Sequence, residues 1–289
     1  LADDDLVAYL RLRTYVLRGR GETRAGSVSP PTPVAPPLHA ETIVQDVLLL
    51  SPDACLLEAD PFAVYCAPAE RIPNLLHEIG RLRELTFRAA GEGTGRDLDL
   101  DRFDAYYLHL FLWNRATREL VGAYRLGLTD VILPRWGKKG LYTSTLFRYS
   151  RRLLDSMGPA LELGRSFVRP EYQRTYSPLL LLWKGIGRFI LREPRYRHLF
   201  GPVSINNEYH SLSRYMMVQF LRANRLDTRW ARHVRPRHPP RRIARRERWN
   251  PDLFRRVVRD MDDIAEMIAD IERDQKGIPV LLKIGRAHV

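Results

Sequence analysis

The stretch from 161 to 191 constrains the fold of this chain more than any other part of the sequence. It begins with alternating apolar and polar residues, which predict a strand with one buried face. A polar loop follows at 169–176 and leads to Ser177 and Pro178, which suit the N-cap and first turn of a helix. Residues 179–191 are apolar on nearly all sides, so we expect a buried helix. A strand, a loop and a helix N-terminus in this order often bind an anionic group.

Length and composition bound the class of protein. With 289 residues, 45% of them hydrophobic, the chain can form one sizeable core or a core and a smaller appendage. No apolar run is long enough to span a bilayer, and the N-terminus shows no signal-peptide pattern. Cys55 and Cys66 lack metal-ligand spacing, so we interpret them as reduced core thiols and expect a cytoplasmic protein.

The charge is strongly basic, at +13, and the basic residues are mostly Arg. Arginines gather between 214 and 256, where the acids are Asp227, Glu247 and Asp252. Such a surplus favours an acidic carrier protein, an anionic membrane surface contacted peripherally on its inner face, or nucleic acid. A solvated Arg-rich segment is the alternative. No motif for nucleic-acid binding accompanies the arginines, so we expect no nucleic-acid partner.

Composition divides the chain into expected segments. A short helical pattern at 1–18 precedes a linker at 19–40 that is rich in Gly, Ser and Pro. The main domain is expected at 41–283, with a basic segment at 222–256 and an amphipathic helix at 251–274. Residues 284–289 resemble a translated sequencing adapter and are left out of the fold prediction.

Local periodicity predicts the elements of the main domain. Helices are expected at 41–50, 73–87, 145–157 and 211–221, strands at 62–67 and 199–205, and a hairpin from 106–113 and 120–126. The helix at 73–87 carries a charged face that we expect to be solvated: Glu78, Arg81, Arg83 and Glu84. The glycine-rich segment 91–95 neither follows a strand nor opens a helix, so it predicts a mobile loop rather than a dinucleotide site.

The dense acidic cluster comprises Asp97, Asp99, Asp101 and Asp104. The ligand pattern of a calcium loop is absent, so no metal site is predicted. The cluster is either a charged turn or an anchor for a cationic substrate.

The order of these elements predicts an α+β fold and resembles the GNAT acyltransferase fold, a mixed, mostly antiparallel central sheet flanked by helices. Over about 62–224 the chain further resembles acyl-homoserine-lactone synthases and ornithine N-acyltransferases. The matching features are Arg83 and Phe87 at a helix end, the pair Asp101 and Asp104, Arg125 after the hairpin, and the strand motif Glu162-Leu163-Gly164-Arg165.

A closer resemblance is to bacterial hemolysin-like fusion proteins, in which a GNAT unit follows a lysophospholipid acyltransferase domain. This resemblance rests on the sequence segments 78–84, 162–167 and 181–185. The His-Asp motif of that upstream domain is missing, so residues 1–18 are interpreted as its remnant. The sheet is also expected to lack its last C-terminal strands.

The resemblance assigns candidate roles to residues of the site. Glu162 would remove the proton of an amine acceptor, directly or through water, with Arg165 beside it. A purely structural pair of these two residues is the alternative. The expected substrate-binding residues are Arg83, Phe87, Asp101, Asp104 and Arg125. Arg125 and Arg165 would orient Glu162 or bind a substrate carboxylate, and the two aspartates would hold an amino-acid acceptor or pair with Arg83.

On the donor side, the expected residues are Phe167, Val168, Gln173, Arg174 and Ser177. No bound cofactor is expected, and the co-substrate is an acyl thioester of acyl carrier protein or of coenzyme A. The loop at 173–178 has no glycine, which favours the carrier protein because fewer backbone N–H groups can approach a pyrophosphate.

The predicted function is an acyl-thioester-dependent N-acyltransferase that acts on an amino-acid-type amine in lipid metabolism, as in the synthesis of ornithine lipids. Two alternatives remain open. One is glycerolipid or lysophospholipid acyltransferase activity of a longer parent protein in phospholipid biosynthesis. The other is a non-catalytic module that binds a membrane or a carrier protein.

Overall fold

The computed structural model describes residues 31–173, 177–205, 209–238, 258, 260–272 and 278–279. Residues 1–18 and 284–289, about half of the basic segment at 222–256, and Arg174 lie outside these residues. The described residues belong to two compact units. The sheet unit comprises those of 29–202 and 233–238, and the helical unit comprises those of 203–232 and 239–289.

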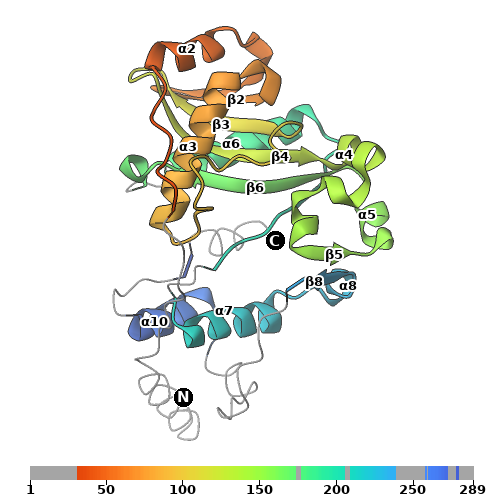
Figure 1. The fold of residues 1–289 in the computed structure, drawn as a ribbon. Helices are drawn as coiled ribbons and strands as arrows, with labels where there is room; N and C mark the ends of the chain where they lie inside the picture. Colours follow the sequence, from red (N-terminus) through yellow and green to blue (C-terminus); the bar gives the residue numbers. More distant parts are fainter. Residues whose placement is uncertain are drawn as a thin grey trace, which may run out of the picture. The chain divides into compact units, whose positions relative to one another are not determined.

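A six-stranded sheet forms the centre of the sheet unit (Figure 1). Its strands, in spatial order, are β1 (Cys55–Ala59), β2 (Phe62–Pro68), β3 (Leu108–Asn114), β4 (Glu119–Leu128), β6 (Ala160–Val168) and β7 (His198–Phe200). All neighbours are antiparallel except β6 and β7, which are parallel. The predicted α+β fold with a mixed, mostly antiparallel sheet is therefore confirmed. β1 was not predicted, and it pairs with the strand expected to be first.

Helices cover both faces of the sheet (Figure 1). On one face, α2 (Ala40–Leu48) and α3 (Pro73–Ala89) pack against side chains such as Phe111 and Trp113. On the other face, α6 (Ser177–Arg192) packs against Leu110 and Leu112. Successive residues of a strand point to opposite faces, so β3 contributes apolar side chains to both cores, and it is buried after the half-buried Leu108 at its start.

The prediction that α6 is buried on nearly all sides is wrong. Leu180 is 53% and Leu191 is 73% exposed, and burial is confined to the face that meets the sheet. Gly185 lies on that face, where a Cβ atom would come within 2.5 Å of Val64 Cγ1. The helix therefore approaches the sheet closely through a residue without a side chain.

The predicted helix at 145–157 is also wrong in its first half. Residues Phe147–Tyr149 form β5, which pairs with β8 (Val234–Pro236), and the helix α5 begins only at Arg151 and ends at Met157. Ser150 separates the two because its hydroxyl accepts the Leu153 backbone N–H at 3.2 Å and caps the helix. Between β4 and β5, the chain forms α4 (Thr129–Trp136) and the short 3-10 helices η3 (Gly137–Gly140) and η4 (Tyr142–Thr145).

In the helical unit, α7 (Ser211–Asn224) packs against α10 (Met261–Ile271) through a shared apolar core, and α8 (Thr228–Ala231) is a single turn. α10 lies within the helix expected at 251–274, and Asp260 and Asp263 form its capping box. The strand expected at 199–205 extends only from His198 to Phe200. In the part of the chain that the structure describes, no helix is long and apolar enough to cross a membrane.

Candidate active site

Glu162 lies on β6, opposite Gly127 of β4 and Phe200 of β7. Its side chain is buried, and the residue is 1% exposed. The Tyr107 hydroxyl donates to one carboxylate oxygen, and the backbone N–H of Thr143 in η4 donates to the other at 2.5 Å. Burial and the neighbouring carboxylate raise the pKa of Tyr107, so its phenol stays protonated and continues to donate. The carboxylate is thus held from two sides.

Three arginines and three aspartates form a buried network beside this carboxylate. Asp104 Oδ1 lies 3.1 Å from both Arg83 Nη2 and Arg125 Nη1. Arg125 also meets Asp101 at 2.7 Å, and Arg165 lies 3.5 Å from Asp99 and 3.7 Å from Asp101. Among the described residues, no ion pair joins Glu162 to Arg165. The structural pair that was the alternative for Glu162 is therefore not the arrangement observed.

The prediction of a solvated charged face on α3 is wrong. Arg83 and Glu84 are fully buried, and Glu78 is nearly so. Glu84 accepts the backbone N–H groups of Thr94 and Gly95, each at 2.9 Å. The glycine-rich loop therefore folds over α3 and is anchored there. It covers the charged face of the helix that was expected to contact solvent.

A β-bulge places Arg165 in the network. Ala123 pairs with Phe167 and Arg125 with Gly164, so Arg165 and Ser166 together oppose a single residue of β4. Arg165 adopts a φ of 50°, which is a sparsely populated conformation for a residue with a side chain. Its guanidinium lies 5.0 Å from the Tyr142 ring and 5.9 Å from the Phe87 ring.

The expected donor-side residues follow the bulge. β7 pairs with β6 only as far as Glu162, so in the described residues no strand covers the last part of β6 on that side. Phe167 is buried in the α3 core, and Val168 packs near α6. Gln173 donates to the Val168 carbonyl at 2.6 Å, and Ser177 begins α6. Their role in binding a donor stays a prediction.

The two cysteines are free and half-buried. Burial raises the pKa of Cys66 to about 12, so its thiol is a poor nucleophile at neutral pH. Among the described residues, no group of His, Cys, Asp and Glu side chains is arranged to hold a metal ion.

Residues 82–184, which carry this carboxylate and its network, match the family model described as an acetyltransferase (GNAT) domain. This part of the chain, about a third of its length, is therefore similar to a GNAT domain. The match confirms the predicted enzyme class, the GNAT superfamily, and the fold is consistent with it.

Three curated relatives share sequence with this chain. The chain is 39% identical over 170 residues to a glycine N(alpha)-acyltransferase of Bacteroides thetaiotaomicron, covering 55% of this chain and 50% of the relative. It is 38% identical over 169 residues to the enzyme of the same name from Phocaeicola vulgatus (55% and 52%). It is 31% identical over 139 residues to an L-ornithine N(alpha)-acyltransferase of Brucella abortus (42% and 47%).

The chain spans about half the length of the curated relatives it matches. The predicted resemblance to ornithine N-acyltransferases is confirmed. The resemblances to acyl-homoserine-lactone synthases and to hemolysin-like fusion proteins stay predictions, as do the expected remnant, linker and domain bounds.

Sequence reasoning did not find Tyr107 or Thr143 as partners of Glu162. Tyr107 is separated from it by 55 residues and Thr143 by 19, and neither belongs to a recognisable motif. A contact made through a backbone N–H, as by Thr143, leaves no trace in the residue type at all.

Gly127 of β4 controls the position of Tyr107. A Cβ atom at this glycine would lie 2.4 Å from Tyr107 Cε1, so Gly127→Ala must displace the ring. We expect the free energy of unfolding to fall by about 1–3 kcal/mol, as for overpacking elsewhere, when measured by chemical denaturation. Gly187→Ala is the matched control because a Cβ atom there would have nothing within 4 Å and α6 favours alanine. Equal stability of the two variants would contradict a tight contact at Gly127.

His109 is buried beneath the network, with Nε2 2.9 Å from the Asp104 carbonyl oxygen. Burial, helped by Arg83 and Arg125, lowers its pKa to about 4, although the Asp104 carbonyl and charge oppose this. The unfolded chain, in which histidine titrates near 6.5, therefore binds more protons than the folded protein between pH 6.5 and 4. Stability falls as the pH drops through this window, by about 3 kcal/mol in total.

His109→Gln removes this titration while keeping a side-chain donor. The stability of the wild type should therefore fall more steeply than that of His109→Gln between pH 6.5 and 4, as followed by urea denaturation. His39→Gln, at an exposed position, should match the wild-type slope. Parallel curves for wild type and His109→Gln would show that this histidine is not held neutral.

Proposed function

We propose that this chain transfers an acyl group from a thioester donor to the primary amine of an amino acid. The observation that carries the proposal is the buried carboxylate of Glu162, held by Tyr107 and Thr143 within the GNAT domain. Relatives named as glycine and L-ornithine N(alpha)-acyltransferases support an α-amino acid as the acceptor class. The product, an N-acyl amino acid, belongs to lipid metabolism.

The reaction needs a base, an unprotonated amine and an electrophilic carbonyl. Glu162 takes one proton from the acceptor nitrogen, directly or through a water molecule, and the nitrogen lone pair attacks the thioester carbonyl carbon. The tetrahedral intermediate then expels the thiolate, forming the amide C–N bond and breaking the C–S bond. The thiolate takes up the proton that Glu162 removed, directly or through water, so the carboxylate is restored and the products are an N-acyl amino acid and a free thiol.

The two donors to Glu162 support this role because they fix the carboxylate and leave further lone pairs on its oxygens. Arg125 lies 5.2 Å from the Tyr107 ring and 5.0 Å from the Tyr142 ring, so it packs beside both. Arg165 and Arg125 form ion pairs with aspartates and not with Glu162. We therefore assign them to positioning the loop at 99–104 and not to contact with the carboxylate.

Asp104 is the buried partner of Arg83, which is one of its two predicted roles. Asp101 keeps more exposure and is the better candidate for contact with the acceptor amine. Phe87 belongs to the same region, because the Arg165 guanidinium lies 5.9 Å from its ring.

The donor side is supported by the free edge of β6 after Glu162 and by the N-terminus of α6 at Ser177. An extended pantetheine arm could pair with that strand edge, because its amides match the spacing of backbone donors and acceptors. The arm is common to acyl carrier protein and coenzyme A. We retain acyl carrier protein as the proposed donor because the sequence 173–178 has no glycine, so fewer of its backbone N–H groups can approach a pyrophosphate.

The test is an acyl-transfer assay with the purified chain. Glycine, ornithine and a lysophospholipid are offered as acceptors with a fatty acyl thioester of acyl carrier protein or of coenzyme A, and mass spectrometry detects the acylated product. Amide formation with either amino acid supports the proposal. Formation of an ester with a lysophospholipid instead, or of no product with either donor, contradicts it.

A further inference from the structure

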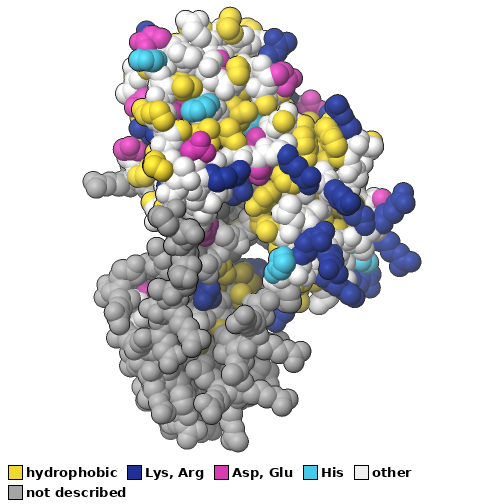
Figure 2. Space-filling model, in the orientation of Figure 1, with side chains coloured by type: hydrophobic (Ala, Val, Ile, Leu, Met, Phe, Trp, Pro, Cys, Tyr) yellow, Lys and Arg dark blue, Asp and Glu magenta, His cyan; other side chains and the backbone are white. Residues whose placement is uncertain are grey.

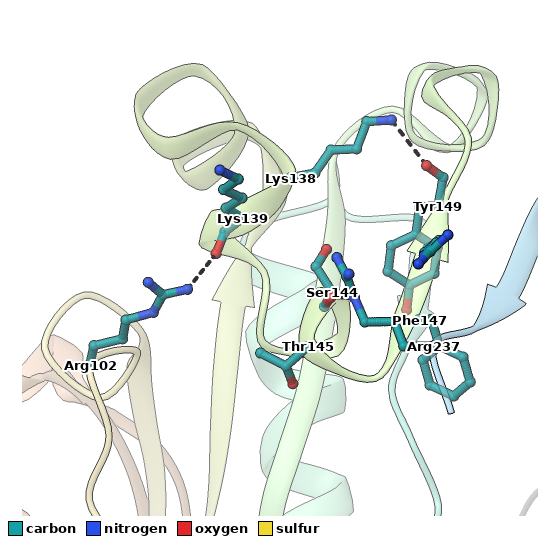
Figure 3. Close-up of a pocket in the computed structure, with 9 residues that line it drawn as sticks. Arg102, Lys138, Lys139, Ser144, Thr145, Phe147, Tyr149 and Arg237 are labelled. Carbon is teal, nitrogen blue, oxygen red and sulfur yellow. Dashed lines mark hydrogen bonds between the residues drawn. The ribbon is translucent and has the colours of Figure 1, made fainter. Parts of the chain in front are cut away.

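Cationic side chains gather over the part of the sheet unit that carries α4, β5 and α5 (Figure 2). A pocket of about 470 Å³ opens there, lined by five cations: Arg102, Lys138, Lys139, Arg148 and Arg237. The other lining residues are uncharged. Figure 3 shows that the lining comes from segments far apart in the sequence, namely the loop before β3, η3, η4, β5 and the residue after β8. The fold has therefore brought these charges together.

These cations are not neutralised by acids. Lys138 donates to the Tyr149 carbonyl at 3.0 Å, Arg102 to the Lys139 carbonyl at 3.1 Å, and Arg237 to the Ser144 carbonyl at 2.6 Å (Figure 3). None of the five forms an ion pair with a carboxylate in the described part of the chain. Charges of one sign around a shared concave space raise the local concentration of an anion.

Ser144 gives a second, independent sign of a ligand. It lines the pocket, is 8% exposed, and its hydroxyl has no hydrogen-bond partner among the described residues. A buried hydroxyl without a partner costs free energy, and native proteins usually provide one. An anionic oxygen in the pocket would accept this hydroxyl proton.

The pocket adjoins the carboxylate of Glu162. Thr143 donates its backbone N–H to Glu162, and the next residue, Ser144, lines the pocket. Tyr149 also lines it, and burial raises the pKa of Tyr149 to about 12, with a further contribution from the charge of Glu162. The pocket therefore borders the residues that surround Glu162.

The pocket is at the wrong end of β6 for the phosphates of a donor. Glu162 is near the start of β6, whereas the expected donor-side residues Gln173 and Ser177 come after its end at Val168. Over the six residues from Glu162 to Val168, a strand extends about 20 Å. A donor whose phosphates lie near Gln173 and Ser177 cannot also place them in the pocket.

We propose that this pocket binds the anionic oxygen group, a carboxylate or a phosphate, of the acceptor whose amine is presented to Glu162. This inference rests on the proposed function. It assigns Lys139, Arg148 and Ser144 to recognition of the acceptor, and it restricts acceptors to primary amines that carry a negative charge.

The test uses variants that break no contact of the folded protein. The side-chain nitrogens of Lys139 and Arg148 make no hydrogen bond or ion pair within the described residues, so Lys139→Gln/Arg148→Gln removes two charges alone. Ser144→Ala removes the unpartnered hydroxyl. Arg151→Gln is the control, since Arg151 is on the neighbouring α5 but outside the pocket. The acceptors are glycine and phosphoethanolamine, with glycinamide and ethanolamine as counterparts without an anionic group.

We expect the double variant to raise KM for glycine or phosphoethanolamine by about tenfold or more, the worth of a hydrogen bond to a charged group. The kcat value and the KM for glycinamide and ethanolamine should change little. Ser144→Ala should act in the same direction with a smaller effect, and Arg151→Gln should match the wild type. The acceptor whose KM rises more in the double variant identifies the anionic group: glycine indicates a carboxylate and phosphoethanolamine a phosphate.

Equal changes in KM for charged and uncharged acceptors would overturn the proposal, as would an equal effect of Arg151→Gln. Loss of binding to phosphatidylglycerol vesicles with KM unchanged would assign the cations to a lipid surface and also overturn it. If the wild type acylates none of the amines, the proposed function fails, and calorimetric titration with glycine and phosphoethanolamine decides on the pocket. Binding that weakens in the double variant supports the site, and no binding, or equal binding by wild type and variant, overturns it.

Discussion

Glu162→Gln is expected to lower the turnover of acyl transfer by about a hundredfold or more while the protein stays folded. The amide has nearly the same shape as the carboxylate, so its oxygen can still accept one of the two donors, Tyr107 or Thr143. What it loses is the capacity to take a proton from the acceptor amine. The measurement is kcat at saturating donor and acceptor, with thermal unfolding followed on the same preparation.

Glu70→Gln provides the matched control because it removes the same charge at an exposed position. It should leave kcat unchanged. A folded Glu162→Gln variant with wild-type kcat would remove Glu162 from the chemistry and leave it as a structural carboxylate between β6, Tyr107 and η4. A variant that loses its fold would show that the carboxylate is needed for packing.

Local sequence patterns predicted the elements of this fold that depend on neighbours in the chain. The apolar repeat of α3, the two apolar runs of the β3–β4 hairpin, and the Ser-Pro start of α6 each arise within a few residues. The same reasoning failed at β5, because that strand is defined by its pairing with β8 some 85 residues later. A three-residue strand has no periodicity of its own to read.

The charged residues of α3 show a second limit of the sequence. Spacing alone cannot distinguish a solvated charged face from one covered by another segment. Arg83 is buried because Asp104, 21 residues away, folds over it, and Glu84 is buried because the loop at 94–95 does. Only the resemblance to acyltransferases singled out Arg83, and it did so without showing the partner.

The candidate site also has one part that the sequence indicated and one that it did not. Glu162 was found from a strand motif, and its role as a base is still a prediction. The cationic pocket was not anticipated, because its cations come from segments between Arg102 and Arg237. The arginine-rich range 214–256 is the basic surplus that the sequence shows, and much of it lies outside the described residues.

Asp104→Ala is expected to lower the free energy of unfolding at pH 7 by about 3–5 kcal/mol, the usual cost of breaking a buried ion pair by removing one partner. Arg83 would lose its only ion-pair partner among the described residues, and Arg125 would keep only Asp101. Asp60→Ala is the control, because Asp60 is 89% exposed in its side chain and pairs with Arg115 at 3.4 Å at the surface. Surface pairs of this kind contribute about 0–1 kcal/mol.

The pH dependence separates a charge effect from a packing effect at this position. Burial alone would raise the pKa of Asp104, but the guanidinium groups of Arg83 and Arg125 outweigh it and hold the pKa at about 2. The carboxylate therefore stabilises the fold fully above its ordinary pKa of about 3.9, and this contribution is lost as the pH falls toward 2. The stability difference between wild type and Asp104→Ala should be constant above about pH 5 and shrink below pH 4. A difference that persists undiminished to pH 2 would contradict the ion pairs as its cause, because protonated Asp104 could contribute only its shape.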